Sequence, residues 1–124
     1  MIEIFKVFYF DAAHFLPHVG SDHKCSRMHG HSFRVEIHLK APVDSRLGWV
    51  MDFGDMVKAF EPLRNELEHQ CLNQISGLEN PTSENLARWI WRRLQPQLPD
   101  LHKIIVQESE ESGCIYCGED EPFP

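Results

Sequence analysis

The stretch that decides the fold is residues 29–40, which read HGHSFRVEIHLK. From residue 31 to residue 40, apolar and polar side chains alternate, which is the pattern of a strand with one buried face. The apolar side consists of Phe33, Val35, Ile37 and Leu39, and the polar side of Arg34, Glu36, His38 and Lys40. His29 and His31 share the parity of the apolar set, so a strand that reaches back to residue 29 would direct both imidazoles inward.

Two further side chains upstream fit a metal site. His14 follows a first apolar stretch, and Cys25 lies shortly before His29, in the spacing Cys25-x3-His29. Two imidazoles on one face and a third from a neighbouring strand supply three nitrogen ligands, and three protein ligands with one open position are typical of a catalytic zinc. Cys25 has two interpretations. It either joins the zinc as a fourth ligand or stays off it as a nucleophile or base, since a nearby cation favours the thiolate.

Periodicity elsewhere predicts both strands and helices. Strands are expected at residues 2–10, 49–52, 102–108 and 114–116, and helices at 54–69 and from Thr82 or Ser83 to Leu94. The turn-like residues 42–48 predict a hairpin between the strand at 31–40 and the one at 49–52.

Two polar residues near predicted element ends have open interpretations. His69 follows Glu68 near a helix end, where it is either a general acid or base or a solvent-facing residue. Glu108 has the parity of Ile104 and Val106 and either points inward or marks the exposed end of its strand.

Composition limits the class of protein. A chain of 124 residues has room for one domain, and its hydrophobic fraction of 42% is ordinary for a globular protein. No apolar run approaches the roughly 20 residues that span a bilayer. Residues 1–5 lack the features of a signal peptide, so we expect a cytoplasmic protein with reduced cysteines. The net charge of −7 argues against non-specific nucleic-acid binding.

An ordered set of motifs resembles one known family. The motifs are Phe10-Asp11-Ala12-Ala13-His14, Cys25-x3-His29-Gly30-His31, Asp52-Phe53, Leu67-Glu68-His69 with Leu72-Asn73, Pro81-Thr82-Ser83-Glu84-Asn85 and Val106-x-Glu108. From about residue 2 to Tyr116 the chain resembles the 6-pyruvoyl-tetrahydropterin synthase family. The Cys25-x3-His29 spacing looks most like the bacterial 6-carboxy-tetrahydropterin synthase branch of the queuosine and deazapurine pathway.

The resemblance implies an architecture. It is the α+β tunnelling fold, with a four-stranded antiparallel sheet and two helices on one face. The resemblance also implies a homohexamer of two stacked trimers, whose sheets join into a barrel. Residues 1–117 would form the single catalytic domain and residues 118–124 a loose acidic tail.

The resemblance also implies residue roles. His14, His29 and His31 would hold Zn²⁺, Cys25 would accept a proton, and His69 would relay it. Glu108 would anchor the pterin ring and support the relay, while Thr82 and Ser83 would line the pterin pocket. The family usually has Asp where this chain has Glu68, which leaves open whether the carboxylate reaches His69 directly.

The implied reaction converts 7,8-dihydroneopterin triphosphate to 6-carboxy-5,6,7,8-tetrahydropterin, with release of acetaldehyde and triphosphate. Lys24 and Arg27 flank Cys25 and are the expected triphosphate contacts in an otherwise acidic chain. No nucleic-acid or membrane partner is expected. Two alternatives stay open: the 6-pyruvoyl branch, which only eliminates triphosphate, and a non-catalytic zinc module, in which Cys25 is a zinc ligand.

Overall fold

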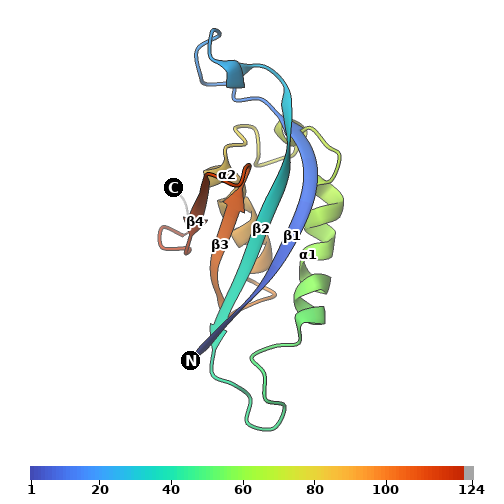
Figure 1. Cartoon of the computed structure of the whole chain (residues 1–124), viewed down its shortest axis with the longest axis vertical. Coiled ribbons are helices and arrows are strands. Elements are labelled where there is room, and N and C mark those ends of the chain that lie inside the picture. The colour runs from blue at the N-terminus through green and yellow to red at the C-terminus, as the bar shows by residue number, and fades with distance from the viewer. Residues whose placement is uncertain (122–124) are drawn as a thin grey trace.

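The molecule is one antiparallel sheet with two helices against it. In the computed structural model, which describes residues 1–121, the strands are β1 (Ile2–His14), β2 (His29–Ala41), β3 (Leu101–Gln107) and β4 (Gly113–Tyr116), in the order β1-β2-β3-β4 (Figure 1). The helices are α1 (Phe53–Leu67) and α2 (Ser83–Leu94), with short 3-10 helices η1 (Lys24–Ser26) and η2 (Leu72–Gln74). This confirms the α+β class with a four-stranded antiparallel sheet and two helices.

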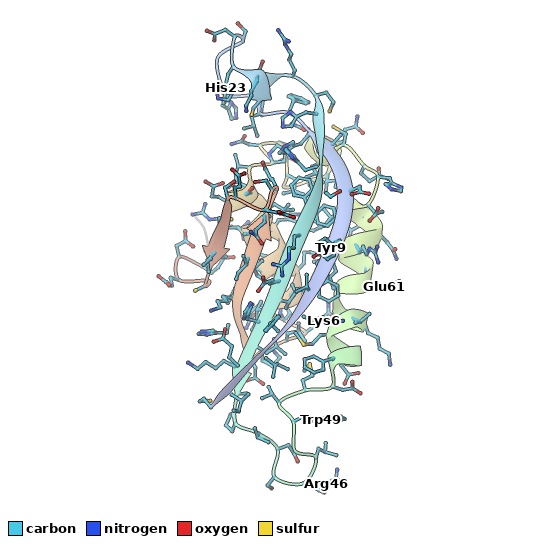
Figure 2. The ribbon with its side chains drawn as sticks, viewed as in Figure 1. Lys6, Tyr9, His23, Arg46, Trp49 and Glu61 are labelled. Atoms are coloured by element: carbon cyan, nitrogen blue, oxygen red, sulfur yellow. The ribbon has the colours of Figure 1, made fainter. Side chains whose placement is uncertain are left out.

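The core lies between the apolar face of the sheet and the helices. Phe33, Val35, Ile37 and Leu39 of β2 are at most 1% exposed, as their alternation predicts. They belong to one buried cluster with side chains of both helices, among them Phe60 of α1 and Ile90 of α2. The opposite face of the sheet is open, and Tyr9 projects from it with 58% of its surface exposed (Figure 2).

The pairing of β1 with β2 positions the histidines. Both strands are longer than predicted, since β1 continues to His14 and β2 begins at His29. Their register places His14 opposite His29 and Ala12 opposite His31. Directly opposed residues in an antiparallel pair project from the same face of the sheet, so all three imidazoles lie on the side of the buried core.

The predicted strand at residues 49–52 is wrong. These residues belong to the loop between β2 and α1, at the opposite end of the molecule from His23 (Figure 2). Asp44 closes this loop by accepting hydrogen bonds from the amides of Arg46 and Leu47, and Asp52 caps α1 through the amide of Gly54. The physical reason is that β1 and β3 occupy the two edges of β2, so no edge remains for the predicted hairpin.

The chain after β4 returns to α2. Asp120 pairs with Arg88, and Glu121 pairs with Arg92, so residues 118–121 of the predicted loose tail are attached to the helix. The rest of that tail, residues 122–124, lies outside the described residues. Within residues 1–121, every helix is too short or too polar to cross a bilayer.

Candidate metal centre and its surroundings

Three histidines converge where β1 and β2 meet. One ligand nitrogen from each of His14, His29 and His31 lies within 4.8 Å of the others. The ring centroids are 4.6 Å apart for His14 and His29, 5.1 Å for His14 and His31, and 5.0 Å for His29 and His31. The predicted ligand residues are therefore together, in a group that can hold a metal ion.

Backbone carbonyls set the tautomer of two of these rings. His14 Nδ1 donates to the carbonyl of Pro81 at 2.8 Å, and His29 Nδ1 donates to the carbonyl of Arg27 at 2.7 Å. Because Nδ1 carries the hydrogen in each bond, the Nε2 atom keeps a free lone pair, which is how metal-ligating histidines are usually oriented. The Nε2 atoms of His14 and His31 are buried without a hydrogen-bond partner, a costly arrangement that a bound cation would relieve.

The surroundings of His14 favour its neutral form. Its side chain is 1% exposed, and burial lowers the pKa of His14 below its ordinary value, with smaller contributions in the same direction from His29 and His31. The hydrogen bond to Pro81 and the charge of Glu108 act in the opposite sense. A neutral imidazole is the form that binds a metal.

Glu108 lies beside this cluster. Its carboxylate oxygens are 3.5 Å from His31 Nε2 and 3.9 Å from His14 Nε2. The Ser83 hydroxyl donates to Glu108 Oε1 at 2.9 Å and so holds the side chain in place. Glu108 also lines a cavity of about 510 Å³, within the range of small-molecule sites, so one carboxylate reaches both the histidines and a binding space.

The two residues predicted to line a pterin pocket have different contacts. Thr82 is the N-cap of α2, and its hydroxyl oxygen accepts from the amide of Asn85 at 3.1 Å. Ser83 is the first residue of the helix and supports Glu108. Both lie next to Pro81, whose carbonyl holds His14, so this turn contacts the metal cluster and Glu108 together.

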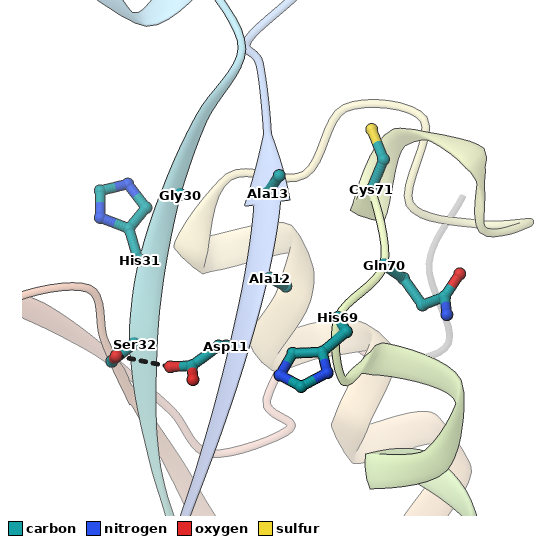
Figure 3. Close-up of a pocket in the computed structure, with 9 residues that line it drawn as sticks. All are labelled: Asp11, Ala12, Ala13, Gly30, His31, Ser32, His69, Gln70 and Cys71. Carbon is teal, nitrogen blue, oxygen red and sulfur yellow. Dashed lines mark hydrogen bonds between the residues drawn. The ribbon is translucent and has the colours of Figure 1, made fainter.

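His69 forms a second cluster on the far side of β1. Its Nε2 is 3.0 Å from Glu68 Oε1, so this carboxylate contacts the ring directly. Asp11 joins them, since ligand atoms of Asp11, Glu68 and His69 lie within 4.8 Å of one another. Asp11 and His69 line a pocket of about 550 Å³ that His31 also borders (Figure 3). The pocket therefore connects the His69 cluster with the metal cluster.

The backbone of His69 is strained. Its φ of 58° is the one positive value at a non-glycine residue among residues 1–121. This left-handed conformation costs about 1–3 kcal/mol, and such strain is concentrated at functional sites. The helix α1 ends at Leu67, earlier than the predicted residue 69, because Glu68 is already extended, and the His69 ring faces β1 (Figure 3).

Cys25 lies apart from both clusters within one chain. It is in η1, where its amide donates to His23 Nδ1 at 3.0 Å and its carbonyl accepts from Leu16. In the part of the chain that is described, neither group of candidate metal ligands includes Cys25. The zinc-module alternative required that residue as a ligand.

Sequence reasoning missed Asp11 and Ser32. The Ser32 hydroxyl donates to Asp11 Oδ1 at 2.5 Å, and the two residues are opposed in the pairing of β1 with β2. Asp11 was visible only as part of a motif, and Ser32 only as a polar residue next to His31. The strand register, once known, is the signal that relates them.

Comparison with known proteins gives a consistent result. Residues 3–119 match the family model described as 6-pyruvoyl tetrahydropterin synthase. A 6-carboxy-5,6,7,8-tetrahydropterin synthase from Synechocystis sp. is 42% identical over 91% of each chain. A dihydroneopterin monophosphate aldolase from Pyrococcus furiosus is 35% identical, over 84% of this chain and 87% of that protein. Among solved structures, the 6-pyruvoyl tetrahydropterin synthase of Caenorhabditis elegans superposes with a TM-score of 0.87 at 23% identity, over 94% of this chain and 95% of that one.

Proposed function

The chain belongs to the 6-pyruvoyl tetrahydropterin synthase family, and from that premise we propose that it is a 6-carboxy-5,6,7,8-tetrahydropterin synthase of queuosine biosynthesis. It would convert 7,8-dihydroneopterin triphosphate and one water molecule to this product, with release of acetaldehyde and triphosphate. The observation that carries the proposal is the 42% identity over 91% of both chains to a relative with that activity. The convergence of His14, His29 and His31 supports it.

We propose that the metal is Zn²⁺. Three imidazoles with an open position form the ligand set of a catalytic zinc, and the buried Nε2 atoms of His14 and His31 fit a cation. When bound, the zinc would act as a Lewis acid toward the side-chain oxygens of the substrate. The Pro81 carbonyl would keep His14 in its ligating tautomer.

Proton transfer would belong to Cys25 and His69. The Cys25 thiolate would accept a proton from the substrate side chain, and His69 would pass protons onward, with Glu68 Oε1 lying 3.0 Å from its Nε2 atom. Within residues 1–121 of one chain, no hydrogen bond or ion pair joins Cys25 to His69. A neighbouring subunit would therefore complete the relay.

Glu108 would bind the pterin ring. Its carboxylate is at the boundary between the metal cluster and the cavity of about 510 Å³, where it can accept from the amino and N–H donors of a pterin. Ser83 would hold this carboxylate, and Thr82 would shape the same end of α2. Lys24 and Arg27, on either side of Cys25, would contact the triphosphate.

We also propose the assembly that the family resemblance implies. Residues 1–117 would be one catalytic domain, and six chains would form two stacked trimers with their sheets joined into a barrel. The open face of the sheet supports this, since Phe5 is 54% exposed and Tyr9 is 58% exposed on it. Covering these side chains between subunits would be favourable.

Product analysis tests the function. The zinc-loaded protein is incubated with 7,8-dihydroneopterin triphosphate, and the products are identified by mass spectrometry, with Cys25→Ala as the inactive control. We expect 6-carboxy-tetrahydropterin, acetaldehyde and triphosphate. A three-carbon side chain on the product would assign the 6-pyruvoyl activity instead. No turnover with zinc bound would indicate a non-catalytic zinc module.

A further inference from the structure

A second carboxylate beside His69 has no role in the reaction described above. Asp11 of β1 has a carboxylate oxygen within 4.8 Å of a ring nitrogen of His69, although Glu68 already contacts that ring (Figure 3). We propose that Asp11 is a positioning residue, which orients the His69 imidazole for proton transfer. The inference rests on the proposed function in one respect, namely that His69 is the proton relay.

The backbone fixes His69 relative to Asp11. The amide of His69 donates to the carbonyl of Asp11 at 2.7 Å, and the amide of Ala13 donates to the carbonyl of Gln70 at 2.9 Å. Ala13 and Cys71 also form a parallel bridge. Residues 69–71 are thus attached along the free edge of β1, and these bonds hold His69 in its left-handed conformation. The backbone hydrogen bonds at the edge of β1 therefore fix His69 close to Asp11.

The Asp11 side chain is fixed as well. The Ser32 hydroxyl donates to Asp11 Oδ1 at 2.5 Å from the adjacent strand (Figure 3). This leaves the other carboxylate oxygen to accept a further hydrogen bond, because an ionised carboxylate has several lone pairs. A short side chain bonded to β2 loses little further freedom when it orients a neighbour.

Glu68 is less suited to orient the ring alone. It lies at the end of α1, has a longer side chain, and its Oε2 is 3.6 Å from Arg64 Nε. Arg64 therefore lies near one oxygen of this carboxylate, while His69 contacts the other oxygen, Oε1. The charged groups around the ring are Asp11, Glu68 and, through Glu68, Arg64. Of the two carboxylates, Asp11 is the one that the sheet holds in place.

The separation of Asp11 and His69 indicates how they interact. The ligand atoms of Asp11 and His69 lie within 4.8 Å of each other, but among residues 1–121 the two side chains form no direct hydrogen bond, which requires about 2.7–3.2 Å. The separation fits one bridging water molecule, which can accept from the ring N–H and donate to the carboxylate. A ring held in this way by Asp11 and directly by Glu68 keeps one orientation while its protonation changes.

The test is Asp11→Asn in the full-length, zinc-loaded protein. Asparagine keeps the size of the side chain, an oxygen that can accept from Ser32, and the backbone carbonyl that binds the His69 amide. It removes the charge and replaces the second acceptor oxygen with an N–H donor. Glu61→Gln is the matched control, since Glu61 is exposed on α1 and loses the same charge. The ring nitrogens are observed by NMR with ¹⁵N-labelled histidine, and the His69 signals are assigned with His69→Gln.

We expect Asp11→Asn to shift the His69 ring signals and to lower kcat roughly tenfold with KM nearly unchanged, as for loss of one hydrogen bond to a charged group. Glu61→Gln should change neither. Unchanged His69 signals would overturn the inference whatever the rate, and so would shifted signals with an unchanged kcat. If the wild-type protein does not turn over the substrate, the proposed function fails. The shift of the His69 ring signals in Asp11→Asn then decides alone whether Asp11 orients this ring.

Discussion

Glu108→Gln separates a pterin-binding enzyme from a bare metal site. Ser83 already donates to Glu108 Oε1, and the amide oxygen of glutamine can accept this bond too. The variant therefore loses the charged acceptor at the second oxygen, Oε2, which lies 3.5 Å from His31 Nε2. A hydrogen bond to a charged group contributes about 1.5–3 kcal/mol. At about 1.4 kcal/mol per tenfold, pterin binding should weaken by roughly one to two orders of magnitude.

The assay is calorimetric titration with neopterin, a pterin that lacks the triphosphate, on the wild-type protein and the variant. Zinc content is measured in each by elemental mass spectrometry and should be equal. Glu110→Gln is the matched control, because Glu110 is an exposed carboxylate that lines the same cavity of about 510 Å³. Equal affinities of wild type and Glu108→Gln would refute the reasoning. An equal loss in Glu110→Gln would refute it too, since the effect would then come from the general charge of the cavity.

Three further outcomes are expected. His29→Ala should lose zinc and activity together, and full zinc occupancy in this variant would contradict the ligand assignment. Cys25→Ala should keep its zinc while turnover falls on the order of 10²–10⁴-fold, the usual contribution of a positioned acid–base group, and near-normal turnover would place the base elsewhere. Burial, with a smaller effect of Glu84, raises the pKa of Cys114 to about 11. Its thiol thus stays protonated at pH 8, and iodoacetamide labelling read by mass spectrometry should modify it more slowly than the exposed Cys117, in the folded protein but not in urea.

Local patterns predicted the elements but not their neighbours. The alternation in residues 31–40 and the apolar spacing of both helices depend only on nearby residues, and the structure confirms these elements. The strand at 49–52 was wrong because its existence depends on a free edge of β2, and that edge is occupied by β3, which comes much later in the chain. Strand pairing is non-local, so a short apolar run cannot reveal whether a partner is available.

The histidine cluster and the His69 cluster also depend partly on local pattern and partly on how distant segments pair. The chain alone determined that His29 and His31 share a face, since side chains alternate along any strand. That His14 meets them was decided by the register of β1 with β2, which depends on thirteen-residue strands pairing along their full length. In the cluster of Asp11, Glu68 and His69, Asp11 comes close to His69 only when the chain folds. Hydrogen bonds to β1 impose on His69 a left-handed conformation that its own preferences disfavour, and only the tertiary structure supplies the energy to hold it there.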